Sequence, residues 1–291
     1  MKSTLILMLL ACLPFLGWSQ THCTAANRQK CEEVLTALQE ANLSDQDMST
    51  IAIAVGKLFL GTPYVAKTLE LDGPEKLVVN LEGLDCTTFM ENVVVFSRLV
   101  QKDELTWDAY QDMLAEVRYR DGQLGEYPDR LHYATDWFFQ NEQKGIIEDI
   151  TQEIGGIPYE KHINFMSTHP TAYTQLASSD EYVKQIADVE RAINDREYCY
   201  IPKERVKALE SGIQSGDLIA ITTPIKGLDV VHVGLAIRQN GRIHLFHAST
   251  GSNEVEISSK PLAEYLAGNR SQSGIMVARL QAVTPRPNAQ H

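Results

Sequence analysis

The carboxy-terminal part of the chain contains a series of short runs rich in β-branched residues, and turn residues separate each run from the next. The runs span residues 217–223, 232–239, 242–249, 254–259 and 274–280. This pattern predicts the strands of an antiparallel sheet. A helical segment at residues 261–266 interrupts the series before its last strand.

The amino-terminal half has a different pattern, in which apolar residues recur at helical spacing. Helices are predicted at residues 28–42, 49–59, 107–118 and 183–193, and a short strand at 77–81. Residues 119–137 have the Gly, Tyr, Arg, His and Asp content of a binding loop, and residues 140–180 are predicted to be irregular. Helices followed by a sheet predict an α+β fold, with a helical lobe at about residues 25–200 and a sheet at about 215–282.

The first 20 residues have the composition of a secretion signal, with Lys2 before an apolar run that ends at Trp18. The run is too short to be expected to span a bilayer. Leu9-Leu10-Ala11-Cys12 resembles a lipoprotein cleavage box, but Cys12 lies within the apolar run, so cleavage after residue 19 or 20 is favoured. We therefore expect a periplasmic protein whose residues 21–291 form one domain, with membrane attachment only if Cys12 carries a lipid.

Charge and cysteine content narrow the classes of partner and cofactor. A formal net charge of −12 argues against a nucleic-acid partner, which would favour a basic surface. Cys23 and Cys31 could pair in an oxidising compartment, and a bridge between Cys86 and Cys199 is an alternative role for those two residues. No C-x-x-C motif is present, so the spacings do not suggest zinc, and no metal or organic cofactor is predicted.

Cys86 lies where a turn signal changes into an apolar helical run. Gly83 interrupts the preceding segment, Asp85 can cap a helix, and apolar residues then recur on one helical face, at Phe89, Val93, Phe96 and Val100. Cys86 is thus predicted to be the first residue of the helix, where unpaired backbone N–H groups and the helix dipole stabilise a thiolate. Catalytic cysteines favour this position; the alternative is a small buried cysteine without a chemical role.

A hairpin signal fixes the relation between two of the predicted strands. Asn240-Gly241 suits a two-residue type I′ turn, so Gln239 is expected to pair with Arg242. Counting outward from this pair places His232 opposite Ser249.

The same count places Gly234 opposite His247 and sorts the histidines by face. His232 and His247 share one face of the sheet, and His244 points to the other. A thiolate nucleophile needs an imidazole base, which in turn needs a polar group to orient it. We therefore interpret His232 as the base and His247 as its partner, with Gly234 and Ala236 leaving room for a helix end. Two structural histidines are the alternative, and the register disfavours a metal site made of all three.

Several motifs occur in an order that resembles a known family. They are Gly61-Thr62-Pro63-Tyr64, Gly83-Leu84-Asp85-Cys86-Thr87-Thr88-Phe89, Arg130-Leu131-His132-Tyr133, Asn164-Phe165-Met166-Ser167 and Leu228-Asp229-Val230-Val231-His232-Val233-Gly234. Together they resemble the N-acetylmuramoyl-L-alanine amidase-like branch, a former family of unknown function, of the NlpC-type papain-like cell-wall hydrolases. The resemblance implies a papain-like core with Cys86 as nucleophile, His232 as base and His247 as third member.

The resemblance also implies a reaction and a substrate. The reaction is hydrolysis of the amide between N-acetylmuramic acid and L-alanine, and the preferred substrates are soluble peptidoglycan fragments with a 1,6-anhydro sugar. Alternatives are a D-glutamyl-diamino acid endopeptidase of the same superfamily and a non-catalytic muropeptide-binding module.

Further substrate-binding residues are predicted around the cleft. Tyr64 and Asp85 match positions that hold a free amine in related peptidases, which an amidase substrate lacks, so their role must differ; Asp85 as a helix cap is the alternative. Tyr133 and Trp137 are candidates for stacking on sugar rings, with a core position the alternative for Trp137. Further candidate hydrogen-bonding residues are Arg130, Asp136, Asn164 and Ser167.

Overall fold

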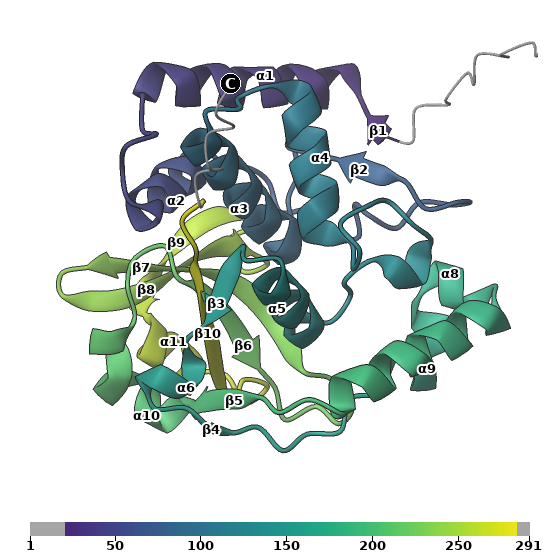
Figure 1. Cartoon of the computed structure of the whole chain (residues 1–291). Helices are drawn as coiled ribbons and strands as arrows, with labels where there is room; N and C mark the ends of the chain where they lie inside the picture. Colours follow the sequence, from purple (N-terminus) through teal and green to yellow (C-terminus); the bar gives the residue numbers. More distant parts are fainter. Residues whose placement is uncertain (1–20, 284–291) are drawn as a thin grey trace, which may run out of the picture.

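The computed structural model describes residues 21–283, so the predicted secretion signal and Cys12 lie outside the described residues. Helices and a sheet form the α+β fold that the sequence predicts (Figure 1). The helices of the first half are α1 (Ala25–Ala41), α2 (Met48–Lys57), α3 (Cys86–Lys102), α4 (Trp107–Arg118) and α5 (Ala134–Gln143). Strands β1 (Thr21–Cys23) and β2 (Leu77–Val79) form a separate parallel pair.

The main sheet has the strand order β4-β5-β10-β6-β7-β8-β9, and β3 also pairs with β10. Its later strands are β6 (Leu218–Thr222), β7 (Val230–Gln239), β8 (Arg242–Ser249), β9 (Glu254–Pro261) and β10 (Gly274–Leu280). These pairings are antiparallel, which confirms the predicted sheet. Three short strands from earlier in the chain extend it, namely β3 (Ile147–Asp149), β4 (Ile157–Pro158) and β5 (Cys199–Pro202).

Helix α3 lies at the centre of the larger core, between α2 and α4 and against strands β7 and β8 (Figure 1). Phe89, Val93, Phe96 and Val100 are all buried, as the predicted helical face requires. A second apolar cluster covers the opposite face of the sheet and includes residues of α10 (Lys203–Leu209) and α11 (Leu262–Ala267). The sheet therefore separates two apolar layers.

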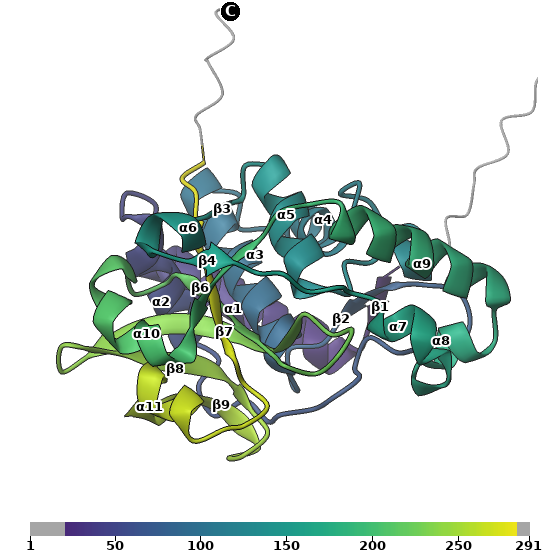
Figure 2. The ribbon, with the colours of Figure 1, turned by 90° about the horizontal axis from the view of Figure 1, so that it is seen from below.

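The segment predicted to be irregular folds into short elements. These are α6 (Thr151–Ile154), α7 (Phe165–Thr168), the 3-10 helix η2 (Pro170–Ala172) and α8 (Thr174–Ala177), in addition to β3 and β4. They are followed by α9 (Asp180–Asn194), and α7, α8 and α9 extend to one side of the sheet (Figures 1 and 2). Two further 3-10 helices are η1 (Tyr127–Asp129) and η3 (Glu210–Gly212).

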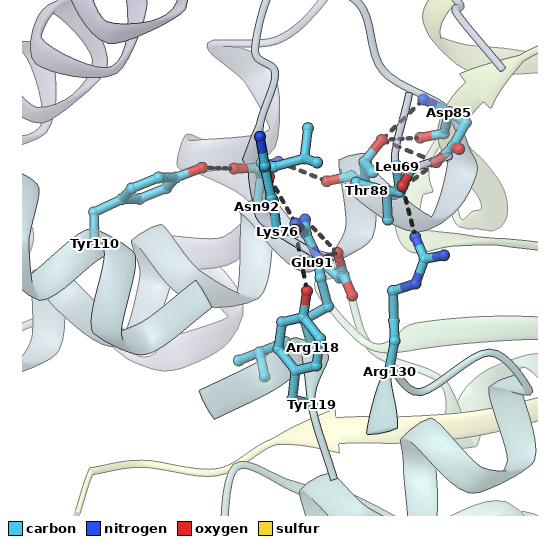
Figure 3. Close-up of polar contacts among 12 residues, drawn as sticks. Leu69, Lys76, Asp85, Thr88, Glu91, Asn92, Tyr110, Arg118, Tyr119 and Arg130 are labelled. Atoms are coloured by element: carbon cyan, nitrogen blue, oxygen red, sulfur yellow. Dashed lines mark hydrogen bonds and ion pairs between the residues drawn. The ribbon is translucent and has the colours of Figure 1, made fainter. Parts of the chain in front are cut away.

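A buried polar network holds the first turns of α3 in place (Figure 3). Glu91 and Arg118 of α4 form an ion pair at 2.8 Å with both side chains 2% exposed, and Arg118 also donates to the Val78 carbonyl of β2. The next residue of α3, Asn92, accepts a hydrogen bond from the Tyr110 hydroxyl. Because these groups are buried and paired, they fix how α3 is rotated against its neighbours.

Candidate active site

Cys86 is the first residue of α3, as predicted, and its position is set by a complete capping box. Asp85 Oδ1 accepts the Thr88 backbone N–H at 2.8 Å, and the Thr88 hydroxyl oxygen accepts the Asp85 backbone N–H at 2.9 Å. The prediction that Asp85 caps the helix is confirmed. The half-buried Cys86 side chain therefore lies at the positive end of the helix.

The hairpin has the predicted turn and register. Asn240 and Gly241 have φ values of 50° and 79°, as a type I′ turn requires, and Gln239 pairs with Arg242. From the turn, residues of β7 and β8 stay paired as far as Leu235 opposite Phe246.

Beyond that pair, the two predicted site histidines meet. His232 Nε2 lies 2.6 Å from His247 Nδ1, and the rings are perpendicular. His244 instead bonds through Nδ1 to the Ser258 carbonyl.

Gly234 has a different role from the one expected. A Cβ atom at this position would lie 2.8 Å from the Phe246 carbonyl oxygen and 2.9 Å from His247 Cβ. Ala236 likewise belongs to the cluster on the face opposite α3. The prediction that these small residues admit a helix end is therefore wrong, and Gly234 instead admits the His247 side chain.

His247 is buried, at 1% exposure of its side chain. Its Nε2 atom has no hydrogen-bond partner among the described residues, and the nearest charged group is Glu256 Oε1 at 3.8 Å. Glu256 is the direct neighbour of His247 across β8 and β9, and the Tyr265 ring of α11 contacts His247 edge-on. This leaves the Nε2 edge of His247 facing a carboxylate.

Cys86 and His232 line the same cavity, which has a volume of about 180 Å³. Most of its other lining is apolar, from Met90, Leu131, Met166 and Leu228 among others. A second cavity of about 250 Å³ shares its wall at Thr87, Leu131, His132 and Tyr173. A polar hollow of about 560 Å³ lies on the other side of His232, beside Glu256 and Tyr265.

A larger hollow of about 700 Å³ lies beside α4 and contains neither Cys86 nor a histidine. We place the candidate site in the smaller cavity, because it holds the groups with nucleophilic and basic chemistry.

Burial controls the protonation of the candidate nucleophile and base. Burial, followed by the charge of Asp85, raises the pKa of the Cys86 thiol to about 11, although the Val233 backbone N–H and Thr87 favour the thiolate. Burial lowers the pKa of His232 to about 4. For His247, burial and then the neighbouring His232 lower the pKa to about 3. Burial thus favours the neutral thiol, against the thiolate stabilisation expected at a helix terminus.

Three of the predicted substrate-binding residues are aromatic, and the structure places them differently. Tyr64 is half-buried beside Cys86: its pKa is raised by burial and then by the charges of Cys86 and Asp85. Tyr133 and Trp137 line the cavity but are only 3% and 1% exposed, so they present no open ring face for stacking. Their predicted role as sugar platforms does not fit this geometry.

Asn164 and Ser167 are absent from the walls of the three cavities around Cys86 and His232. The Ser167 backbone N–H donates to Glu190, whose carboxylate also accepts the Tyr133 hydroxyl. The Asn164 backbone N–H donates to the Gly227 carbonyl. These two residues support the loop beside the cavity rather than face its interior.

Arg130 and Asp136 are held in ion pairs. Arg130 contacts Glu70 at 2.7 Å, and Asp136 contacts Arg120 and Arg196, each at 2.8 Å. Their charges are therefore balanced within the protein.

The sequence pattern indicates no site role for His132, yet this residue lies in the wall between the two cavities. A histidine in a loop has no sequence signal that separates a cavity position from a structural one. Cys23, Cys31, Cys86 and Cys199 are free thiols, so neither the Cys23–Cys31 pair nor the Cys86–Cys199 bridge is formed. Within residues 21–283, no cluster of three or more His, Cys, Asp or Glu side chains could hold a metal ion, and no helix has the length and apolar character to cross a membrane.

A cysteine at the start of a buried helix, beside a histidine pair on an antiparallel sheet, defines the class of papain-like α+β hydrolases. The family model for N-acetylmuramoyl-L-alanine amidase-like proteins matches residues 54–275. The chain therefore belongs to this family, as the motifs predicted.

Solved structures agree with this assignment. An N-acetylmuramoyl-L-alanine amidase from Bacteroides uniformis is 37% identical, with a TM-score of 0.76 over 80% of this chain and 99% of that chain. A Bacteroides fragilis protein described as a candidate xylanase is also 37% identical, with a TM-score of 0.73 over 77% and 98% of the two chains. A Legionella pneumophila protein shares the fold at 20% identity, with a TM-score of 0.68 over 89% and 97%. No match was found among curated proteins.

Proposed function

We propose that the protein is an exported cysteine amidase that cleaves the bond between N-acetylmuramic acid and L-alanine in soluble peptidoglycan fragments, with the sugar in its 1,6-anhydro form. The observation that carries this proposal is the arrangement of Cys86 and His232 in one cavity, with His232 bonded to His247. Family membership and the amidase from Bacteroides uniformis support the bond that is cut.

The hydrogen bond between the histidines assigns the working atoms. His232 Nε2 is engaged with His247 Nδ1, which leaves His232 Nδ1 as the nitrogen that can take the proton of Cys86. For that nitrogen to be a free acceptor, His232 Nε2 must carry the hydrogen and donate it to His247 Nδ1. The hydrogen of His247 then resides on Nε2, the edge that faces Glu256.

The proposed reaction starts from neutral groups. His232 Nδ1 takes the thiol proton as Cys86 Sγ attacks the lactyl carbonyl carbon, and the Cys86 backbone N–H at the helix start stabilises the oxyanion. The carbon–nitrogen bond then breaks, and His232 returns the proton to the amine of L-alanine. Water, deprotonated by His232, hydrolyses the thioester and restores the thiol.

The test uses an anhydro-disaccharide tetrapeptide with the mature protein and a Cys86→Ala variant. We expect mass spectrometry to find free disaccharide and intact tetrapeptide with the mature protein and neither with the variant. A matched substrate with a reducing sugar measures the preference for the anhydro form. Cleavage inside the peptide would instead support the endopeptidase, and binding without cleavage by either protein would support the binding module.

Export is tested separately. Expression of the full chain, followed by cell fractionation and amino-terminal sequencing, is expected to give a periplasmic protein that begins at residue 20 or 21. A protein that keeps residue 1 in the cytoplasm would contradict export, and a lipid on Cys12 would support the alternative anchor.

A further inference from the structure

His132 occupies the wall shared by the two cavities next to Cys86. Its Nε2 atom lies 2.8 Å from the Tyr127 backbone carbonyl, and its ring packs against the Tyr127 ring at 4.4 Å. A carbonyl oxygen can only accept, so Nε2 must carry a hydrogen and donate it. The ring is thereby anchored in one orientation.

This contact determines what the other ring nitrogen can do. Burial, and then the charge of Arg130, lowers the pKa of His132 well below its ordinary value, so the ring is neutral at pH 7. With the single hydrogen on Nε2, Nδ1 is a hydrogen-bond acceptor. It makes no hydrogen bond with any residue in the described part of the chain. A ligand in the cavity would therefore meet an acceptor there.

Trp137 supplies the complementary group. Its ring lines the cavity at Cys86 and is 1% exposed, and its Nε1–H has no acceptor within residues 21–283. Buried donors in native proteins are almost always satisfied, so an unpaired indole N–H on a residue of the cavity wall points to a ligand acceptor. The surrounding side chains Met90, Leu131 and Met166 are apolar.

One acceptor and one donor in an apolar cavity complement a secondary amide, which offers an N–H and a carbonyl. We propose that this cavity binds an amide of the substrate other than the one that is cut, with His132 Nδ1 accepting its N–H and Trp137 Nε1–H donating to its carbonyl. The proposal rests on the proposed function for the substrate, which carries two such groups near the bond that is cut: the acetamido group of the muramic acid and the peptide bond that follows L-alanine.

The test measures binding of 1,6-anhydro-N-acetylmuramoyl-L-alanyl-D-isoglutamine by calorimetry in a Cys86→Ala background, where the proposed chemistry is stopped. Two substitutions of His132 separate the two ring nitrogens. His132→Gln places its amide near Nε2, so it keeps the contact with Tyr127 and loses the acceptor. His132→Asn places its amide near Nδ1, so it keeps the acceptor and loses the contact.

We expect His132→Gln to weaken binding about tenfold at an unchanged melting temperature, and His132→Asn to lower the melting temperature with a smaller loss of binding. Trp137→Phe, which keeps a smaller aromatic ring and removes the N–H, should also weaken binding. Unchanged affinity in both His132→Gln and Trp137→Phe, or no binding in the Cys86→Ala protein at about 1 mM probe, would overturn the proposal.

A de-N-acetylated probe identifies the source of the amide. If the acetamido group is bound, this probe loses affinity in the Cys86→Ala protein and loses no more when His132→Gln is added. If the peptide amide is bound, the de-N-acetylated probe binds as tightly as the acetylated probe, and His132→Gln weakens its binding. Failure of the amidase proposal is seen separately, as binding of the acetylated probe without hydrolysis of the anhydro-disaccharide tetrapeptide by the wild-type protein.

Discussion

At the scale of single residues, the balance between burial and the helix dipole determines the chemistry of Cys86. A helix terminus stabilises a thiolate by partial charges alone, whereas removal from water penalises the full charge and here dominates. The same penalty lowers the pKa of His232, because the charged form of an imidazole is the protonated one. Both shifts favour a neutral thiol and a neutral imidazole, the forms from which the proposed reaction starts.

The first prediction follows from the raised thiol pKa. The rate of Cys86 alkylation by iodoacetamide should rise about tenfold per pH unit from pH 7 to pH 10, because only the thiolate reacts and its fraction increases below the pKa. Peptide mapping by mass spectrometry follows Cys86 separately from Cys199, which serves as an internal reference. A rate that is already constant near pH 7 would show a resting ion pair instead.

At the scale of elements, the site depends on how α3 and the strands β7, β8 and β9 are held relative to one another. The capping box positions the start of α3, and the ion pair between Glu91 and Arg118 fixes its rotation. On the sheet, Gly234 admits His247, and strand pairing places Glu256 beside it.

Loss of one partner from the buried ion pair should strongly destabilise the protein. Arg118→Ala leaves Glu91 charged and buried, which typically costs about 3–5 kcal/mol of unfolding free energy. Urea denaturation measures this loss. Lys184→Ala, which breaks an exposed pair with Glu181 on α9, is the control and should cost less than about 1 kcal/mol. Equal effects of the two substitutions would show that burial of the Glu91 pair is unimportant.

Glu256 is predicted to orient His247 through its Nε2–H. Glu256→Gln should lower kcat about threefold to tenfold with little change in KM, and should shift the acidic limb of the pH profile downward, because an imidazolium loses a nearby anion. Glu254→Gln changes an exposed carboxylate on the same strand and is the matched control. If Glu256 has only a structural role, Glu256→Gln will lower the stability of the protein and leave the pH profile unchanged.

At the scale of the whole molecule, the packed fold surrounds His132, His232 and His247 closely enough to disfavour their charged forms. Burial lowers the pKa of His132, His232 and His247 below the ordinary value of 6.5. Below pH 6.5 the unfolded chain therefore binds protons that the folded chain does not, and stability falls as the pH drops toward 4.

The melting temperature should accordingly decrease by roughly 5–10 °C between pH 7 and pH 5. Scanning calorimetry across this range measures the slope. His247→Gln should reduce the slope, because one of the three groups is removed, whereas His169→Gln, at an exposed position, should leave it unchanged. A slope that is the same in both variants would assign the acid sensitivity to other groups.

Features that depend on neighbours along the chain follow from the amino-acid sequence alone. Turn residues and apolar periodicity locate α3 and its cap, and Asn240-Gly241 sets the register that brings His232 and His247 together. Periodicity and turn chemistry are local properties, so they can be read from a single sequence. The family also followed from motifs in their order along the chain.

Which groups lose contact with water, and which meet across the fold, depends on the packing of the whole chain. The raised pKa of Cys86, the burial of Trp137, the place of His132 between two cavities and the proximity of Glu256 to His247 all depend on segments far apart in the sequence. The short strands β3, β4 and β5 likewise form because β10 and one another supply their partners. Desolvation and long-range pairing are properties of the packed molecule, and no local pattern encodes them.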